Sequence, residues 1–441
     1  MATRVSTERA TFSAAAGIIT VVAALNVIGL VMILSSSSVA AIRGYGSAWY
    51  FVGKQALWAG MGAVALFAGW KIDHRFWRKR RFIMLAVTFL LLGVVLVPGA
   101  GTRVYGATRW ITLGPLSLQP SELAKFTLGV FVADILAARH RRLADWRVGL
   151  LPVGLATGAV VALVMAQPDM GTSTCILLVV GGMVVVSGVP RRHLTRSIGG
   201  VALLAVLLAW LEPYRRDRLL SFRHPFAQSQ GNGYQLAQSL VGLGSGGPTG
   251  VGLGQSRAKW GFLPNAHTDF IFAIIGEEGG LAGTMFVLGL FIVLAGLGVR
   301  TARRSPDRFG ALLAAGITTW LVGQALINIG AVIGSLPVTG VPLPFVSFGG
   351  SALLISMFAA GVLANIATAG DSPVEPRRPQ RRRPAGQDKA QAGAARSRGS
   401  TRSNDVVAAA KSRRAHSASY LSRVTRPAEI KAPSRRGRPA G

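Results

Sequence analysis

The chain has 441 residues, of which 50% are hydrophobic and only 15% are charged, and its mean hydropathy is +0.44. A soluble enzyme is excluded, because so few charged side chains could not cover the surface of a water-soluble protein of this size. The 48 Lys and Arg residues exceed the 17 Asp and Glu residues by a net charge of +31, which is typical of a membrane protein whose basic residues set its orientation.

Apolar runs long enough to cross a bilayer, roughly 17–25 residues each, recur along most of the chain. The first run resembles a signal peptide because Arg4 and Arg9 precede it, but it is too long, so we expect an uncleaved helix. We therefore predict an all-α membrane protein with ten spanning helices, at residues 13–34, 49–70, 82–98, 120–138, 149–166, 172–189, 197–211, 269–297, 310–333 and 348–368.

The connections between these predicted helices differ in charge. Those between helices 2–3, 4–5, 6–7 and 8–9 contain 6, 4, 3 and 4 Lys and Arg residues, whereas those between helices 5–6 and 9–10 contain none. Because cationic loops remain in the cytoplasm, both termini are predicted to be cytoplasmic. The long connection at 212–268 carries six basic residues but is predicted to face outward, since long loops cross the membrane largely regardless of charge.

A polar segment precedes and opens the fourth predicted helix. Arg109 and Trp110 lie ahead of this helix, and Pro120 suits its first position. Glu122 and Lys125 are three residues apart, so they are predicted to form an ion pair on one helix face. Two interpretations stay open, because such a pair either holds neighbouring helices together or lines a cavity.

The large outward loop at 212–268 has an unusual composition. From Gly231 to Gly254 it contains nine glycines in 24 residues, which disfavours both a helix and lipid-exposed backbone. Glycines let backbone N–H groups approach an anion, and nearby cations would supply the countercharge for a phosphate or pyrophosphate. The alternative is a flexible connector. The candidate cations are Arg215, Arg218, Arg257 and Lys259.

Asp269 lies where this loop meets the eighth predicted helix. A carboxylate that is half desolvated at such a junction is suited to proton abstraction. The alternative is that Thr268 or Asp269 caps the helix. The helix dipole would then stabilise the charged carboxylate and lower its pKa. His267 would either tune this site or simply be solvated.

Two acidic residues lie within the eighth predicted helix. At 1.5 Å per residue, Glu277 is about 12 Å deeper than Asp269 and roughly 80° around the helix, while Glu278 points to the opposite side. Acidic groups at that depth need partners and are functional candidates. Pairing with Asn328 or Lys125 would make them structural. We expect a structural role for Glu278 and leave the role of Glu277 open.

The entry into the tenth predicted helix is irregular. Residues 336–351 contain three prolines and the pair Gly349-Gly350, which exclude a helix there. Backbone of this kind is expected to lie against protein or water rather than lipid.

The chain therefore divides into a cytoplasmic N-terminus at 1–12, a ten-helix domain at 13–370 and a tail at 371–441. The tail has 18 Lys and Arg residues against five Asp and Glu residues and almost no aromatic residues, so we expect it to be disordered. It would bind either anionic lipid, at about 1 kcal/mol per basic residue near the membrane, or an acidic protein partner.

Several of these phrases together resemble the SEDS family of shape, elongation, division and sporulation proteins. The resemblance runs from the first to the tenth predicted helix and is greatest to the division branch, although 342–345 also suits the elongation branch. The phrases are Arg109-Trp110-Ile111, Gln119 to Lys125, 167–172, 213–218, 233–240, Phe262 to Ala273, Glu277-Glu278 and 336–351.

The resemblance implies a membrane glycosyltransferase that polymerises lipid II into peptidoglycan strands, with undecaprenyl pyrophosphate as the leaving group. It places the essential aspartate of the family at Asp269, as the general base. The substrate-binding residues that we expect with it are Arg109, Trp110, Glu122, Lys125, Arg215, Arg218, Gln235, Ser256, Lys259 and Glu277.

The expected partners are lipid II, the undecaprenyl-linked glycan, a class B penicillin-binding protein, anionic lipids and other division proteins, including FtsZ through the basic tail. Nucleic acid is not expected. The expected location is the bacterial plasma membrane at the division septum. Cys175 is the single cysteine and excludes a disulfide framework and a cysteine-based zinc site. A divalent cation such as Mg²⁺ stays open as a cofactor, because glycine-rich loops accept Mg²⁺-bound phosphates.

Three alternative functions remain. A lipid II flippase would use the intramembrane acids and a basic cavity to carry the headgroup across the membrane. A non-catalytic division scaffold would use the tail to bind an acidic partner. An elongation-type polymerase, like RodA, would perform the same reaction in the other branch of the family.

Overall fold

The structure is a computed structural model, and it describes residues 13–99, 101–104, 107–114, 116–200, 225–227, 231 and 233–371. The described residues belong to one compact unit. The predicted N-terminus at 1–12 and almost all of the predicted tail lie outside the described residues.

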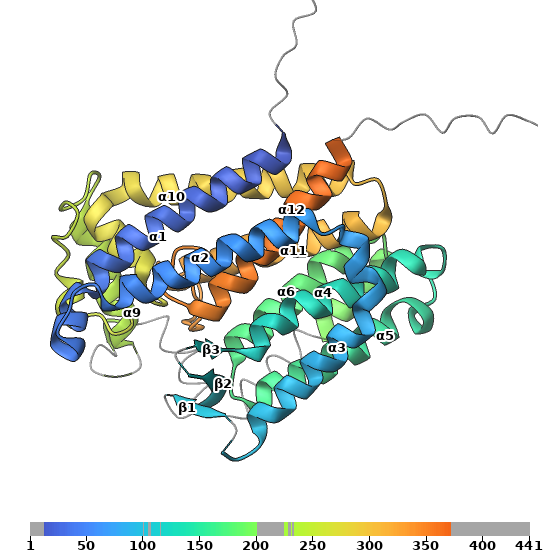
Figure 1. Cartoon of the computed structure of the whole chain (residues 1–441), viewed down its shortest axis with the longest axis horizontal. Helices are drawn as coiled ribbons and strands as arrows, with labels where there is room; N and C mark the ends of the chain where they lie inside the picture. The colour runs from blue at the N-terminus through green and yellow to red at the C-terminus, as the bar shows by residue number, and fades with distance from the viewer. Residues whose placement is uncertain are drawn as a thin grey trace, which may run out of the picture. The chain divides into compact units, whose positions relative to one another are not determined.

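The described part of the chain is mostly helical, as predicted (Figure 1). Helices occur at every predicted span except 197–211, which lies outside the described residues from position 201 onward. The helices are α1 (Ala14–Tyr45), α2 (Tyr50–Lys71), α3 (His74–Leu96), α4 (Pro120–Ala138), α5 (Trp146–Ala166), α6 (Met170–Val186), α9 (Tyr234–Gly246), α10 (Ile271–Arg304), α11 (Arg308–Val332) and α12 (Gly350–Asp371), with short 3₁₀ turns η1 (His140–Arg142) and η2 (Ala258–Trp260).

Six helices in the described parts are long and apolar enough to cross a membrane: α1, α2, α5, α10, α11 and α12. The chain is thus a multi-pass membrane protein. α3 begins with the basic run Arg78 to Arg81, and α6 has only 17 residues. α4 contains Glu122, Lys125 and Asp134, yet most of its side chains are buried inside the protein. Its charged groups therefore face protein partners rather than lipid.

A small antiparallel sheet precedes α4, which the sequence did not predict. Its strands are β1 (Thr102–Val104), β2 (Ala107–Leu113) and β3 (Leu116–Leu118), in the order β1-β2-β3. Ile111 pairs with Leu118 in β3, and Trp110 pairs with Thr102 in β1. The sheet positions Arg109 and Trp110 beside the start of α4.

The prediction that glycine prevents a helix between 231 and 254 is wrong for its first half, because α9 spans Tyr234–Gly246. A Cβ atom at Gly246 would lie 1.9 Å from the backbone oxygen of Gly276 in α10. Glycine at this position allows the backbones of the two helices to pack closely, a packing advantage that outweighs its low helix propensity.

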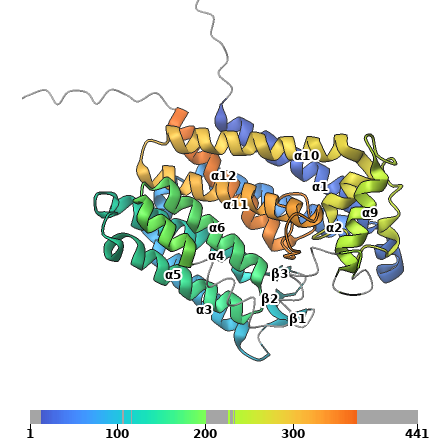
Figure 2. The same ribbon diagram turned by 180° about the vertical axis from the view of Figure 1, so that it is seen from behind.

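The sheet and α9 lie toward one end of the helical body, opposite the start of α1 and the end of α12 (Figures 1 and 2). We call the end with α9 and the sheet the outer end, following the predicted orientation, and the opposite end the inner end. At the inner end, Arg75 pairs with Asp307 at 3.2 Å, and Arg78 pairs with Asp134 at 2.6 Å. The predicted basic connections thus gather at one end and are joined there by ion pairs.

Candidate catalytic site before helix α10

Asp269 lies in the turn that leads into α10, and its side chain is partly buried. The N-cap residue of α10 is Phe270, whose side chain makes no capping hydrogen bond to the residues that the structure describes. The Thr268 hydroxyl donates instead to the backbone oxygen of Asn265 at 3.1 Å. The helix α10 therefore begins only after Phe270, later than the predicted start at Asp269.

The backbone around Asp269 is held by neighbours that are distant in sequence. The backbone N–H of Phe348 donates to the His267 oxygen at 2.9 Å. The Ser347 hydroxyl donates to the Thr268 oxygen at 2.6 Å, and the Asn328 amide donates to the Asp269 oxygen at 2.7 Å. Three successive carbonyl groups are thus each paired with a different donor, which restrains the backbone of Asp269.

Two of these donors belong to the segment at 333–349 between α11 and α12. The predicted irregular stretch at 336–351 is non-helical up to Gly349, but Gly350 and Ser351 already belong to α12. Gly340 has a φ of 70°, and a Cβ at that position would lie 3.5 Å from Oδ2 of Asp269. The same stretch packs against the start of α6, because a Cβ at Gly171 would lie 2.6 Å from the Thr339 oxygen. The segment therefore connects the Asp269 carboxylate with the first turn of α6.

Arg109 contacts that same region from the sheet. Its Nε donates to the backbone oxygen of Gln167 at 3.1 Å, and its Nη2 donates to that of Pro168. Trp110, its neighbour on β2, is half-buried. The turn between α5 and α6 thus lies between Arg109 and the segment that contacts Asp269, which places both predicted residues at the outer end.

Glu277 is buried in α10 and accepts hydrogen bonds from the loop at 247–260. Its carboxylate accepts from the backbone N–H groups of Arg257 at 2.8 Å and Ala258 at 3.3 Å, and from the Ser256 hydroxyl. Glu278 accepts from the Ser35 hydroxyl at 2.5 Å and from the Ser256 N–H at 3.3 Å. The suggested partners Asn328 and Lys125 are therefore wrong for both acids.

Lys259 lies on the loop that these acids hold. Its backbone N–H approaches the Ser256 hydroxyl at 3.4 Å, and its ammonium group donates to the backbone oxygen of Gly254. Lys259 is only partly buried, whereas Ser256 is fully buried. Of these two candidate residues, Ser256 therefore anchors the loop, and Lys259 is accessible to a ligand at the outer end.

Glu122 and Lys125 form the predicted ion pair, in which the Lys125 ammonium lies 2.9 Å from Oε1 and 2.8 Å from Oε2 of Glu122. Both side chains are almost completely buried, with exposed fractions of 3% and 2%. Lys125 also donates to Oε1 of Gln324 in α11 at 2.8 Å, and Trp320 donates to the same oxygen at 2.9 Å. The pair thus joins α4 to α11 inside the helical body.

Three predicted substrate-binding residues remain, and the structure describes one of them. Gln235 is half-buried in the first turn of α9. Arg215 and Arg218 lie outside the described residues. Sequence reasoning missed Ser347 and the contact of Asn328 with Asp269. A polar Asn328 within an otherwise apolar helix was the available signal, since buried polar groups in membrane helices require partners.

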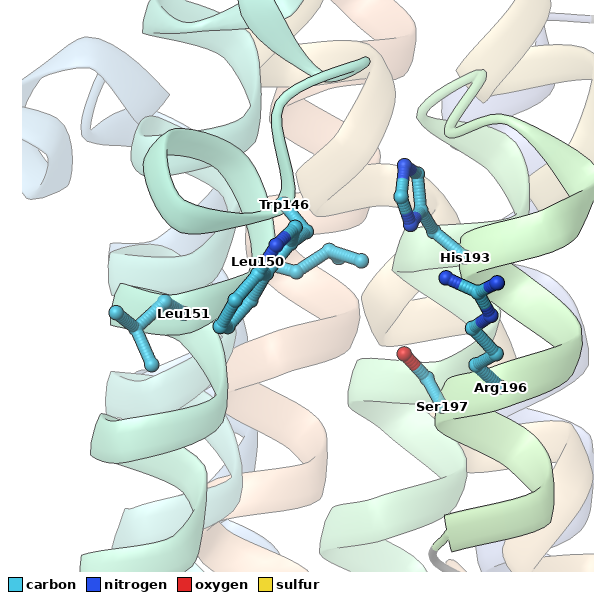
Figure 3. Close-up of a pocket in the computed structure, with 6 residues that line it drawn as sticks. All are labelled: Trp146, Leu150, Leu151, His193, Arg196 and Ser197. Carbon is cyan, nitrogen blue, oxygen red and sulfur yellow. The ribbon is translucent and has the colours of Figure 1, made fainter.

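A cavity of about 380 Å³ lies elsewhere, between α5 and the helical residues 191–200 (Figure 3). His193 in its wall hydrogen-bonds the backbone oxygen of Ala144 at 3.1 Å, beside the basic connection between α4 and α5. The cavity therefore belongs to the inner end and not to the Asp269 site. Its lining residues are Trp146, Leu150, Leu151, His193, Arg196 and Ser197.

Among the residues that the structure describes, no three His, Cys, Asp or Glu side chains are grouped closely enough to hold a metal ion.

Comparison with known proteins identifies relatives of the whole helical body. Residues 16–371 match the FtsW/RodA/SpoVE family, described as cell cycle protein. The chain is 43% identical over 350 residues to the probable peptidoglycan glycosyltransferase FtsW of Mycobacterium tuberculosis. The matching region covers 79% of this chain and 67% of that protein.

Solved structures resemble the same region. One is a peptidoglycan synthase complex, studied for its coordination of polymerization and crosslinking, with 29% identity and a TM-score of 0.68 over 81% of this chain and 98% of the other. Another is the rod shape determining protein RodA of Thermus thermophilus, with 28% identity and a TM-score of 0.60 over 81% of this chain and 97% of the other.

Proposed function

The chain belongs to the FtsW/RodA/SpoVE family of cell cycle proteins and is a peptidoglycan glycosyltransferase, and we propose that Asp269 is its general base. In this reaction Asp269 takes the proton from the 4-hydroxyl of the incoming lipid II sugar. That oxygen then forms a bond to the anomeric carbon of the growing chain. The bond between this carbon and the phosphate oxygen breaks, and undecaprenyl pyrophosphate leaves with the electron pair.

The single observation that supports this role is the placement of the Asp269 carboxylate. It is partly exposed at the outer end, and the backbone that carries it is restrained by hydrogen bonds at three successive carbonyl groups. A general base must be reachable by the acceptor hydroxyl and must be held in a defined position. A carboxylate at a fixed, accessible helix entry satisfies both requirements.

The leaving pyrophosphate requires positive charge, and we assign this role to Lys259 and Arg109. Lys259 lies on a loop that is held to α10 by Glu277, and its ammonium group contacts a backbone oxygen that a phosphate could replace. Arg109 donates from Nε and Nη2 to the turn between α5 and α6. Fixed cations near the developing negative charge would lower the barrier to departure.

We also propose a partner and a location for this reaction. Glycan strands need crosslinking, so the chain is proposed to act beside a class B penicillin-binding protein. The similarity to a peptidoglycan synthase complex supports such an assembly. The relatives named FtsW support action at the division septum rather than in elongation.

Replacement of the proposed base is the direct test. Asp269→Asn keeps the size of the side chain but removes its ability to accept a proton, so strand synthesis from purified lipid II should fall to background. Asp73→Asn is the matched control, because Asp73 caps α3 at the inner end through the Arg75 N–H at 2.8 Å. Polymerisation by a folded Asp269→Asn protein would remove the assignment.

A lipid II flippase is not favoured by any contact in the described residues. The buried acids that transport would use are already engaged, Glu122 by Lys125 and Glu277 by the loop at 247–260. Reconstituted vesicles distinguish the two functions, since a polymerase forms glycan chains whereas a flippase moves the headgroup without forming them.

A further inference from the structure

Asn328 is a buried polar residue in the apolar helix α11, with an exposed fraction of only 2%. Its Nδ2 donates to the backbone oxygen of Asp269 at 2.7 Å and to that of Val341 at 2.8 Å. Val341 follows Gly340, whose backbone lies beside the Asp269 carboxylate. A single amide group therefore connects the residue that carries the carboxylate with the segment that borders it.

We propose that Asn328 is a positioning residue for Asp269, which sets the direction of the carboxylate without touching the substrate. This inference rests on the proposed role of Asp269 as the general base. The position of a short side chain depends directly on the backbone from which it extends. Pairing the Asp269 carbonyl therefore restrains where its carboxylate can point.

The Asp269 carbonyl lies just before α10, whose N-cap residue is Phe270. At the start of the helix, the backbone N–H of Ala273 donates to the Phe270 oxygen at 2.9 Å. The Asn328 amide donates to the Asp269 oxygen, so a side chain of α11 restrains the peptide that leads into α10. Loss of the Asn328 amide would remove this donor from a partly buried carbonyl, and the turn would be expected to shift.

Ser347 restrains the preceding peptide in the same way. Its hydroxyl donates to the Thr268 oxygen at 2.6 Å and accepts from the Leu343 N–H at 2.8 Å. Gln55 of α2 donates to the backbone oxygen of Ser347 at 3.3 Å. The support of Asp269 therefore extends from α11 through the segment at 333–349 to α2, and Asn328 is the member that contacts Asp269 itself.

A purely structural role is the alternative, and Asn365 in α12 provides the matched control. Its Nδ2 donates to the Trp70 oxygen at 2.7 Å, and its Oδ1 accepts from the His74 N–H at 3.0 Å. Asn365 thus bridges two backbone segments, as Asn328 does, but at the inner end. Truncation of either residue removes the same amide group, so a general loss of stability would affect both variants alike.

The experiment compares Asn328→Ala with Asn365→Ala in the full chain, using purified lipid II as the substrate. For each variant we would measure kcat, KM and the thermal unfolding temperature in the same detergent. We expect Asn328→Ala to lower kcat by about 10- to 100-fold with little change in KM, because small displacements of a reacting group cost about this much. Asn365→Ala should lose comparable stability and retain nearly full kcat.

Two further variants keep the inference testable if Asn328→Ala does not fold. Asn328→Gln retains the amide donor but displaces it by one methylene, so its kcat should lie below that of the original chain with little change in KM. Ser347→Ala leaves Asn328 in place and removes the restraint on the preceding peptide, so it should also lower kcat relative to the original chain. Equal kcat values for folded Asn328 and Asn365 variants would overturn the inference, as would a change in KM alone.

The outcome also separates this inference from the proposed function. If Asp269→Asn is inactive and Asn328→Ala has normal turnover, only the positioning role fails. If Asp269→Asn remains active, the general-base assignment fails together with the positioning role.

Discussion

The Ser256 hydroxyl donates a hydrogen bond to the Glu277 carboxylate, which joins the outer loop to the buried side of α10. Together with the N–H groups of Arg257 and Ala258, this contact surrounds the acid with donors from a single turn. Hydrogen bonds to a charged acceptor are stronger than neutral ones. Glu277 is therefore one anchor of the loop that carries Lys259.

Replacement of this anchor should release the loop. Glu277→Ala leaves several buried donors without their acceptor, so we expect a loss of about 2–3 kcal/mol in the free energy of unfolding and faster proteolysis between 247 and 260. Limited proteolysis and thermal unfolding would measure both effects. Ser245→Ala is the control, because its hydroxyl donates to the Gly242 oxygen within its own helix, at 2.8 Å. Equal protease resistance in both variants would contradict the anchoring role.

Lys259 should affect turnover more than stability. Its proposed contact is the leaving pyrophosphate, and loss of one group that stabilises developing charge typically costs about 100-fold in rate. Lys259→Ala should therefore reduce strand synthesis strongly while the unfolding temperature changes little. Lys54→Ala is the control for a removed cation, since Lys54 donates to the Tyr50 hydroxyl at 2.7 Å near the start of α2. Equal rates for the two variants would remove Lys259 from the reaction.

The buried pair of Glu122 and Lys125 predicts a non-additive effect on stability. Lys125→Met leaves the Glu122 charge buried without its partner, so the free energy of unfolding should fall by about 3–5 kcal/mol. Addition of Glu122→Gln removes the uncompensated charge and should recover much of this loss. Unfolding of the single and double variants in the same detergent provides the measurement. A double variant that is less stable than Lys125→Met would show that the pair is not coupled in this way.

His267 should make the outer loop sensitive to acid. The His267 ring packs between two phenylalanine rings, with centroid distances of 4.8 Å to Phe51 and 5.7 Å to Phe348. This burial lowers the pKa of His267 from its ordinary value of 6.5. Below pH 6.5 the His267 ring is protonated more readily in the unfolded chain than in the folded chain. The free energy of unfolding therefore decreases as the pH is lowered. Above it the ring is neutral in both states, and this cost disappears.

The corresponding variant is His267→Phe, which retains an aromatic ring but cannot be protonated. The unfolding temperature of the original chain should decrease as the pH falls below about 6.5, and the decrease should be smaller in His267→Phe. His140→Phe, at the inner end, controls for the loss of a histidine. The same pH slope in the original chain and in His267→Phe would refute the prediction.

The contact of α9 with α10 should tolerate no side chain at Gly246. A Cβ at this position would lie 1.9 Å from the Gly276 oxygen, whereas a Cβ at Gly244 meets nothing within 4 Å. Gly246→Ala should therefore destabilise the protein by about 1–3 kcal/mol, and Gly244→Ala should be neutral or stabilising by up to about 1 kcal/mol. Thermal unfolding of the two variants tests the contact, and equal unfolding temperatures would exclude it.

The sequence by itself determined where most of the helices lie and that they belong in a membrane. Long apolar runs can satisfy their backbone groups in a bilayer only as helices, so local composition is sufficient. The ion pair of Glu122 and Lys125 was predictable for a similar reason, because a helix brings residues three apart together. Asp269 could be placed at a helix entry, but the residues that hold it could not be identified.

Only the tertiary structure decided the partners of the buried polar groups. Asn328 contacts Asp269 across 59 positions, and Ser347 contacts Thr268 across 79. Gly246, at the end of α9, approaches Gly276 of α10 closely, and local propensity does not reveal this contact. Such pairings depend on how the helices pack, since a buried donor takes whichever acceptor the packed bundle brings within reach.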